Sequence, residues 1–220
     1  MPASRMSIPR GMVMASKRES PKTAGEWADA ALEAFARGGV RAASIPAIAR
    51  TLGVTKGSFY WHFRSFGELM DTALGRWEER DRETLERLAA VDDPRARLTE
   101  LFAESIEATR AQALFVALSG SSIPEVSASI RRVSDRRIRF LADAYRELGF
   151  DEEEARNRAL LVYSAYAGLL QLRSEPSSWL RSAKSVNAFV RHAVATLVPG
   201  QGQKKTTRRS GARAGRSRAG

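Results

Sequence analysis

The chain has 220 residues, of which 43% are apolar and 28% charged, so it is long enough and apolar enough to bury a core of its own. It contains no cysteine, which excludes a disulfide framework and a catalytic thiolate and favours a reducing compartment. No apolar run approaches the roughly 18 residues of a membrane-spanning helix. The N-terminus also lacks the continuous apolar segment of a secretory signal, so the composition predicts a globular protein.

The net charge of +11 is concentrated at the two ends of the chain. Residues 1–22 hold five basic residues and one acidic residue, residues 200–220 hold seven basic residues and no acid, and residues 23–199 hold 24 of each sign. Both ends lack hydrophobic periodicity, which predicts disordered basic arms at 1–20 and 200–220. These arms either keep the protein soluble or bind the phosphates of nucleic acid without regard to sequence. Four of the five methionines lie in the first 14 residues, so a translation start at Met12 or Met14 is the alternative to a genuine N-terminal arm.

Two short helices are predicted after the N-terminal arm. The segment "AGEWADAALEAFARGG" repeats apolar residues at helical spacing and stops at two glycines, which predicts a helix over 23–37. The segment "IPAIARTL" predicts a second helix, with Ser44 as its N-cap and Gly53 at its end. Small Ala49 would let a third helix approach closely, so we expect a helix-turn-helix motif over 44–63.

The segment "TKGSFYWHF", residues 55–63, concentrates aromatic side chains and is compatible with a strand or a helix. As a helix capped by Thr55 and running to Phe63, it would place Phe59 and Phe63 on one buried face. The side chains left free to contact DNA would be Lys56, Ser58, Tyr60, Trp61 and His62. The alternative for Tyr60 and Trp61 is packing against a neighbouring helix. Gly57 weakens a helix by about 1 kcal/mol relative to alanine, which suggests that the backbone approaches a partner there.

The stretch "AALEAFARGG…SIPAIARTLGVTKGSFYWHFRSFGELMDTAL", within residues 22–75, resembles the DNA-binding domain of the TetR (tetracycline repressor) family of transcriptional regulators. The resemblance implies an all-α, dimeric repressor in the bacterial cytoplasm, bound to the nucleoid, with a DNA-binding domain at 21–81 and a ligand-binding and dimerisation domain at 82–199. The family often has a basic residue at the start of the fourth helix, where this chain has Phe66, and Arg64 is the expected substitute. The predicted DNA-binding residues are Ser44, Thr55, Lys56, Gly57, Ser58, Tyr60, Trp61, His62 and Arg64.

The remainder of the chain predicts further helices and no strand, about nine helices in all. A long fourth helix is expected over 67–90, with Glu78–Arg82 and Glu83–Arg87 as ion pairs on its solvated face. Later helices are expected from Pro94, across "ALFVALS", over 124–148, after Asp151, and across "SSWLRSAKSVNAFVRHAVATL".

The last two helices are predicted to form the dimer interface, with burial inside one protomer as the alternative. The residues expected there are Leu160, Leu161, Tyr163, Ser164, Ala167, Gly168, Leu170, Phe189, Val190, Ala193 and Leu197. A pocket for an unknown small-molecule effector is predicted among aromatic and apolar residues that could equally be ordinary core. These residues are Trp77, Phe102, Ile106, Phe115, Tyr145, Tyr163 and Tyr166.

Nothing in the sequence points to enzyme chemistry. There are two histidines, in unrelated contexts, and no metalloprotease, nucleophile-elbow, P-loop or dinucleotide motif, so no cofactor and no metal are expected. A carboxylate-only active site is the remaining enzymatic alternative.

The sequence thus predicts a ligand-responsive repressor that binds a palindromic operator as a homodimer. The alternative is a helical protein-interaction module without sequence-specific DNA binding, which would lack salt-dependent DNA binding.

Overall fold

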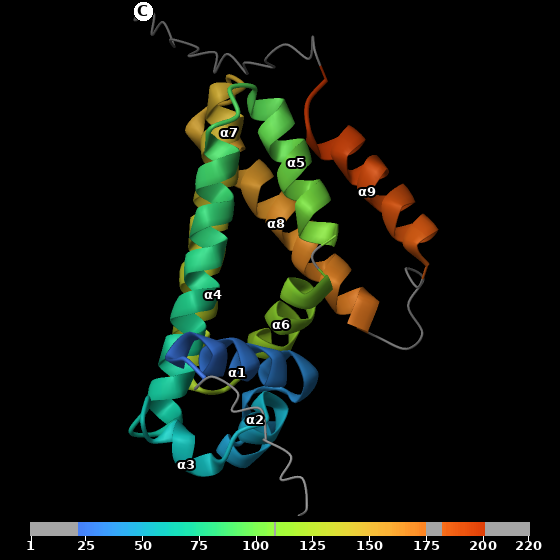
Figure 1. Cartoon of the computed structure of the whole chain (residues 1–220). Helices are drawn as coiled ribbons and strands as arrows, with labels where there is room; N and C mark the ends of the chain where they lie inside the picture. Colours follow the sequence, from blue (N-terminus) through green and yellow to red (C-terminus); the bar gives the residue numbers. More distant parts are fainter. Residues whose placement is uncertain (1–21, 108, 175–181, 201–220) are drawn as a thin grey trace, which may run out of the picture.

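The computed structural model describes residues 22–107, 109–174 and 182–200, and the side chains of 105–107 and 109–112 are not described. The described residues are all-α, as predicted, and contain no strand (Figure 1). The elements are α1 (Ala24–Gly38), the 3₁₀ turn η1 (Val40–Ala42), α2 (Ile45–Leu52), α3 (Lys56–Phe59), α4 (Phe66–Ala89), α5 (Pro94–Glu107), α6 (Thr109–Ser119), α7 (Pro124–Glu147), α8 (Glu152–Ser174) and α9 (Ala183–Leu197). None of the described helices is both long enough and apolar enough to span a bilayer.

Capping side chains and one glycine set the boundaries of the N-terminal helices. The Thr23 hydroxyl accepts from the Glu26 amide at 3.2 Å, and the Glu26 carboxylate accepts from the Thr23 amide at 2.8 Å, which makes a capping box for α1. The Ser44 hydroxyl accepts from the Ala47 amide at the start of α2, as predicted. Gly53 ends α2 in the left-handed conformation, with φ of 72°, which a residue with a Cβ adopts only at a cost.

The third helix is shorter than predicted. It ends at Phe59 rather than Phe63, and the Thr55 hydroxyl makes no capping hydrogen bond. Instead, the Ser58 hydroxyl donates to the Thr55 carbonyl at 2.8 Å. The amides of Tyr60 and His62 donate to carbonyls three residues back, so the chain continues as tight turns. Aromatic residues and Gly57 have low helix propensity, and the turns still bring Phe63 back into the core.

One core joins the N-terminal helices to the beginning of the C-terminal region. Trp27 of α1 and Phe59 are fully buried, with their ring centroids 5.4 Å apart. The same core contains Trp77 of α4, Leu118 of α6 and Val126 of α7. Helix α1 therefore rests on α4 and α6 together, and Figure 1 shows it lying across the lower end of α4.

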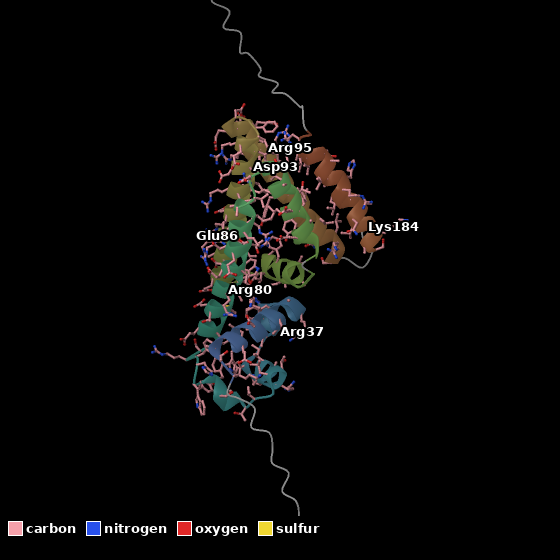
Figure 2. All side chains as sticks on the ribbon, turned by 45° about the horizontal axis from the view of Figure 1, so that its top comes forward. Arg37, Arg80, Glu86, Asp93, Arg95 and Lys184 are labelled. Carbon is pink, nitrogen blue, oxygen red and sulfur yellow. The ribbon has the colours of Figure 1, made fainter. Side chains whose placement is uncertain are left out.

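A second core fills the opposite end of the molecule, between α4, α5, α7, α8 and α9 (Figure 2). It contains Leu85, Leu98, Leu141 and Tyr145, whose hydroxyl donates to the Leu197 carbonyl at 2.8 Å. That hydrogen bond attaches the end of α9 to α7 and satisfies the polar atom of a fully buried ring.

The ion pairs predicted along α4 are wrong. Arg82 pairs with Glu79 and Glu86 of its own helix, whereas Arg87 reaches Glu104 of α5 at 2.7 Å. Glu78 turns toward α7, where it accepts from Arg132 at 2.6 Å and from the Ser129 hydroxyl at 2.5 Å. Spacing along one helix shows which side chains can meet, but a better-placed partner on another helix takes precedence.

We expect Ala49→Leu to overpack the contact between α2 and α3, because Ala49 is buried and its carbonyl accepts from the Val54 amide in the turn. The loss of stability should be on the order of 1 to 3 kcal/mol. Thermal or urea unfolding measures it, with Arg50→Leu on the exposed face of the same helix as the control. Equal stability of the two variants would contradict this packing.

Candidate nucleic-acid interface

Helices α2 and α3 lie at one end of the molecule, on the side of α1 away from α5, α8 and α9 (Figure 1). The turn between them is fixed by the left-handed Gly53 and by the Val54 amide, which donates to the Ala49 carbonyl at 3.0 Å. The two helices and this turn form the predicted helix-turn-helix.

Two large aromatic side chains project from the residues that follow α3. Tyr60 is 56% exposed and Trp61 is 81% exposed. Beneath them, Phe59 is fully buried and meets the Tyr60 ring edge-to-face, with centroids 5.1 Å apart. Neither exposed ring is packed away against a neighbouring helix. Large exposed aromatic surface costs solvation free energy, so its presence at one end indicates a binding surface.

The other predicted DNA-binding residues are divided between exposed and half-buried positions. The whole set except Ser44 comes from one continuous segment, whereas Ser44 lies at the start of α2, where its hydroxyl caps that helix. Ser58 and His62 are half-buried, and the Ser58 hydroxyl is already bonded to the Thr55 carbonyl. The exposed members are Ser44, Thr55, Lys56, Gly57, Tyr60, Trp61 and Arg64.

Nothing in the described chain requires a glycine at position 57. A Cβ built there would meet only the Thr55 hydroxyl oxygen, at the ordinary contact distance of 3.7 Å. Gly57 also lies outside the left-handed region that only Gly39, Gly53 and Gly149 occupy among the described residues. The absence of a side chain at Gly57 therefore favours a close approach by something outside the chain.

The position where the family often has a basic residue is structural here. Phe66 begins α4 and is half-buried, with its ring 6.3 Å from that of Phe35. Arg64 is exposed, and its backbone amide donates to the Glu68 carboxylate at 2.7 Å, so its guanidinium projects from an anchored backbone.

Two neighbouring cavities lie in the C-terminal region, between α5, α7, α8 and α9. Phe102, Tyr163 and Tyr166 of the predicted pocket line the first of them, and Phe102 and Tyr166 also line the second. The other predicted pocket residues lie elsewhere. Trp77 belongs to the first core, and Tyr145 is buried in the second core. Phe115 packs against the first core, with its ring centroid 6.0 Å from that of Tyr166. The side chain of Ile106 lies outside the described residues.

A buried ion cluster beside the first cavity was missed in the sequence analysis. The Asp81 side chain is 3% exposed and accepts from Arg136 at 3.0 Å and from Arg137 Nε at 2.6 Å. The sequence did contain a signal for it. Asp81 falls four residues after Trp77 and four before Leu85, on the buried stripe of α4, where a carboxylate needs a partner.

Hydroxyl groups extend this cluster toward α8. Ser134 and Tyr163 share a hydrogen bond of 2.6 Å, and Arg137 lies over the Tyr166 ring, 5.6 Å from its centroid. Burial raises the pKa of the Tyr163 and Tyr166 hydroxyls above the ordinary value, while the charge of Arg137 opposes that rise. Both hydroxyls therefore stay protonated near neutral pH and can donate. Among the described residues, no group of acidic, histidine or cysteine side chains is arranged to hold a metal ion.

Part of the predicted dimer surface is exposed. On α8, Leu161 is 57% exposed and Leu160 is also exposed, and a Cβ at the exposed Gly168 would have nothing within 4 Å. Ser164 of α8 and Phe189 of α9 are exposed as well. The other predicted residues are half-buried or buried within the protomer: Tyr163, Ala167, Leu170, Val190, Ala193 and Leu197.

The fold and this surface define an all-helical protein with an N-terminal helix-turn-helix. Residues 28–72 match the family described as "Bacterial regulatory proteins, tetR family". The chain is 37% identical over 68 residues to the HTH-type transcriptional regulator TtgR of Pseudomonas putida, a match that covers 31% of this chain and 32% of that protein. It thus spans about a third of the length of that curated relative. Over residues 28–72, the chain therefore carries the N-terminal domain of the tetR family of bacterial regulatory proteins.

Solved structures share the fold over most of the chain. A TetR transcriptional regulator from Legionella pneumophila has a TM-score of 0.68 at 16% identity, covering 86% of this chain and 100% of that chain. A putative transcriptional regulator from Saccharomonospora viridis, solved in complex with choline, has a TM-score of 0.65 at 18% identity, covering 78% and 95%. At these identities the likeness concerns the fold alone.

We expect Trp61→Ala to leave stability within about 0.5 kcal/mol of the parent, because its side chain is exposed. Tyr60→Ala should cost about 0.5 to 1.5 kcal/mol, because it loses the edge-to-face contact with Phe59. Both variants should weaken DNA binding. Phe59→Ala should instead cost about 3 to 5 kcal/mol, because it empties the space beside Trp27. Unfolding midpoints and binding to DNA, measured by fluorescence anisotropy, test both statements. Unaltered DNA affinity in Trp61→Ala and Tyr60→Ala would contradict the assignment of this surface.

Gly57→Ala should separate stability from binding. The alanine fits the chain and should stabilise α3 by up to about 1 kcal/mol, while its methyl group obstructs the approach of DNA to the backbone. The expected result is an unfolding midpoint at or above that of the parent with reduced DNA affinity. Gly75→Ala is the matched control, since Gly75 lies in α4 with nothing within 4 Å of an added Cβ. An equal change in DNA affinity in the two variants would overturn this role for Gly57.

Proposed function

We propose that this protein is a sequence-specific DNA-binding transcriptional regulator, a ligand-responsive repressor that acts as a homodimer on a palindromic operator. The observation that carries the proposal is the pair of exposed aromatic side chains, Tyr60 and Trp61, on a buried Phe59 at the end of a helix-turn-helix. In this proposal the protein acts on the nucleoid in the bacterial cytoplasm and is not an enzyme.

The exposed groups suit the two kinds of contact that DNA offers. Lys56 and Arg64 carry positive charge for phosphates, which position the protein without reading sequence. Tyr60 and Trp61 each combine an apolar ring with a hydrogen-bond donor, which suits the base edges and thymine methyl groups of the major groove. Gly57 lies between Lys56 and Tyr60, and its backbone can approach the DNA closely because it carries no side chain.

A homodimer is supported by the exposed leucines of α8. Leu160, Leu161 and Leu172 are exposed on this helix, and Gly168 leaves room beside them for a second helix. Burying such a face against its copy would be favourable by roughly 25 cal/mol per Å² of apolar surface. Two helix-turn-helix units related by a two-fold axis then require a palindromic operator with half-sites about 34 to 36 Å apart, or a multiple of this distance.

The position of α4 supports regulation by a small molecule. This helix contacts α1 in the first core and carries Asp81, the partner of cavity-lining Arg137, at the level of the cavities. The structure of the Saccharomonospora viridis neighbour in complex with choline is a precedent for a small molecule bound to a protein of this fold. An effector would alter DNA affinity only to the extent that it binds the two conformations differently. The proposed units are a DNA-binding domain at 21–81 and an effector and dimer domain at 82–199.

Selection of DNA from a random pool by the purified protein tests the proposal. We expect enrichment of an inverted repeat whose half-sites lie about 10 to 10.5 base pairs apart, or a multiple of that. A pool that stays random after several rounds at physiological salt would contradict sequence-specific binding. That outcome would leave a helical protein-interaction module as the better explanation.

The dimer part of the proposal has its own control. Leu161→Glu places a charge on the exposed face of α8, so sedimentation velocity should show a monomer that has lost most of its affinity for the full palindrome. Ala89→Glu, at an exposed position of α4, should leave the dimer and its affinity unchanged. A Leu161→Glu protein that sediments as a dimer would exclude this interface.

A further inference from the structure

The two cavities in the C-terminal region are neighbours, and they become one space with unlike ends only when the side chains between them move. They share Phe102 and Tyr166 as a common wall, and their volumes, open mouths included, are about 290 and 240 Å³. The enclosed part of each holds only about one or two water molecules, so a larger ligand enters by moving these two side chains. The side chains around these cavities indicate the chemistry of that ligand, if the protein has the proposed regulatory function.

One end of this space carries an arginine with donors to spare. Arg137 lines the first cavity, and its Nε donates a hydrogen bond to the Asp81 carboxylate. A guanidinium has five N–H donors, of which Asp81 engages Nε, and the Tyr166 hydroxyl is the other partner of this side chain. Its two terminal nitrogens have the spacing that a carboxylate accepts in a bidentate manner.

The charges around Arg137 leave it incompletely neutralised. Asp81 is shared with Arg136, which also donates to the Glu78 carbonyl at 3.1 Å. The other carboxylate on this face of α4, Glu78, is held by Arg132 and Ser129. Glu79 of α4 also acts on Arg136, but it is itself paired with Arg82. Three arginines of α7 thus share two carboxylates of α4, Glu78 and Asp81. A cationic ligand would be repelled here, and an anionic one would complete the pairing.

Next to Arg137, two tyrosines provide further donors. Tyr163 and Tyr166 line the same cavity, and burial raises the pKa of both hydroxyls above the ordinary tyrosine value, which already keeps them protonated at neutral pH. An O–H group donates to an anion more strongly than to a neutral oxygen. The Tyr163 hydroxyl is free to donate when Ser134 is the donor in the hydrogen bond that the two share. A carboxylate beside Arg137 would then meet a charged donor and neutral donors on one wall.

The other end of the space is apolar. The first cavity is completed by Leu101, Leu141 and Val162, and the second lies between α5, α8 and α9. The second cavity is lined, besides the shared pair, by Ala165, Leu169, Phe189, Val190 and Ala193. An apolar body extending from the arginine would bury its surface among these side chains.

We propose that the effector of this protein is an amphipathic monoanion, with a carboxylate at Arg137 and an aryl or short alkyl body that passes Phe102 and Tyr166 into the second cavity. Arg137 is hydrogen-bonded to Asp81, so the ligand's charge acts on a residue of α4. The binding event is thereby connected to the helix that contacts α1.

Isothermal titration of the full-length protein with phenylbutyrate, phenylbutanol and phenylbutylamine tests this inference, since the three share one apolar body and differ in charge. Phenylbutyrate should bind about ten-fold or more tightly than the alcohol, and the amine should bind most weakly. Equal affinities, tighter binding of the amine, or no binding of phenylbutyrate at millimolar concentration would each overturn the proposal.

Two substitutions with opposite expected effects separate ligand recognition from a structural role. Arg137→Gln should lower the preference for phenylbutyrate over phenylbutanol by about ten-fold, whereas Asp81→Asn, which removes the competing charge, should raise that preference. Arg139→Gln, at an exposed position of the same helix, should leave it unchanged. A preference that falls equally in Arg137→Gln and Asp81→Asn would mean that the cluster is structural only.

Operator binding distinguishes failure of this inference from failure of the proposed function. A protein that binds its selected operator but shows no preference for the anion refutes only the ligand chemistry. A protein that selects no operator refutes the regulatory function, whatever its cavities bind. The unliganded protein is therefore assayed on the selected DNA alongside each titration.

Discussion

The buried carboxylate of Asp81 is paired with Arg136 and Arg137 at the boundary between the first and the second hydrophobic core. On α4 it stands between Trp77 of the first core and Leu85 of the second, and on α7 Arg137 stands between Val133 and Leu141. A buried charge without its partner is strongly destabilising, so the pair admits only the alignment of α4 and α7 that joins them. With 24 residues, α4 extends about 36 Å at 1.5 Å per residue, and this contact about two thirds of the way along it relates its two ends.

The exposed aromatic surface depends on the first core. Phe59 is buried against Trp27 of α1, which allows the residues immediately after it to project outward. That core also contains Leu114 and Leu118 of α6, a helix that contacts α8 beside the cavities. Helix α1, against which α2 packs, thus rests on two helices that approach the proposed effector space, α4 and α6.

Local features of the fold were predictable wherever neighbouring residues decide them. The N-cap at Ser44 and the helix end at Gly53 follow from short-range hydrogen bonding and from the left-handed conformation that glycine tolerates. The length of α3 was overestimated, because its last residues take tight turns that return Phe63 to the core. The ion pairs of Glu78 and Arg87 were also mispredicted, since their partners come from α7 and α5.

The sequence by itself determined the all-helical class, the helix-turn-helix and the candidate reading residues, because helical periodicity, caps and the motif's spacing are written within a few residues of one another. Only the tertiary structure decided which aromatic residues line the cavities, that Tyr60 and Trp61 are exposed while Trp77 and Tyr145 are core, and that Asp81 meets Arg137. Residues on the same apolar face of a helix cannot be told apart by the hydrophobic pattern of the sequence. Which of them face a cavity, solvent or another helix depends on how helices distant in the chain cross one another.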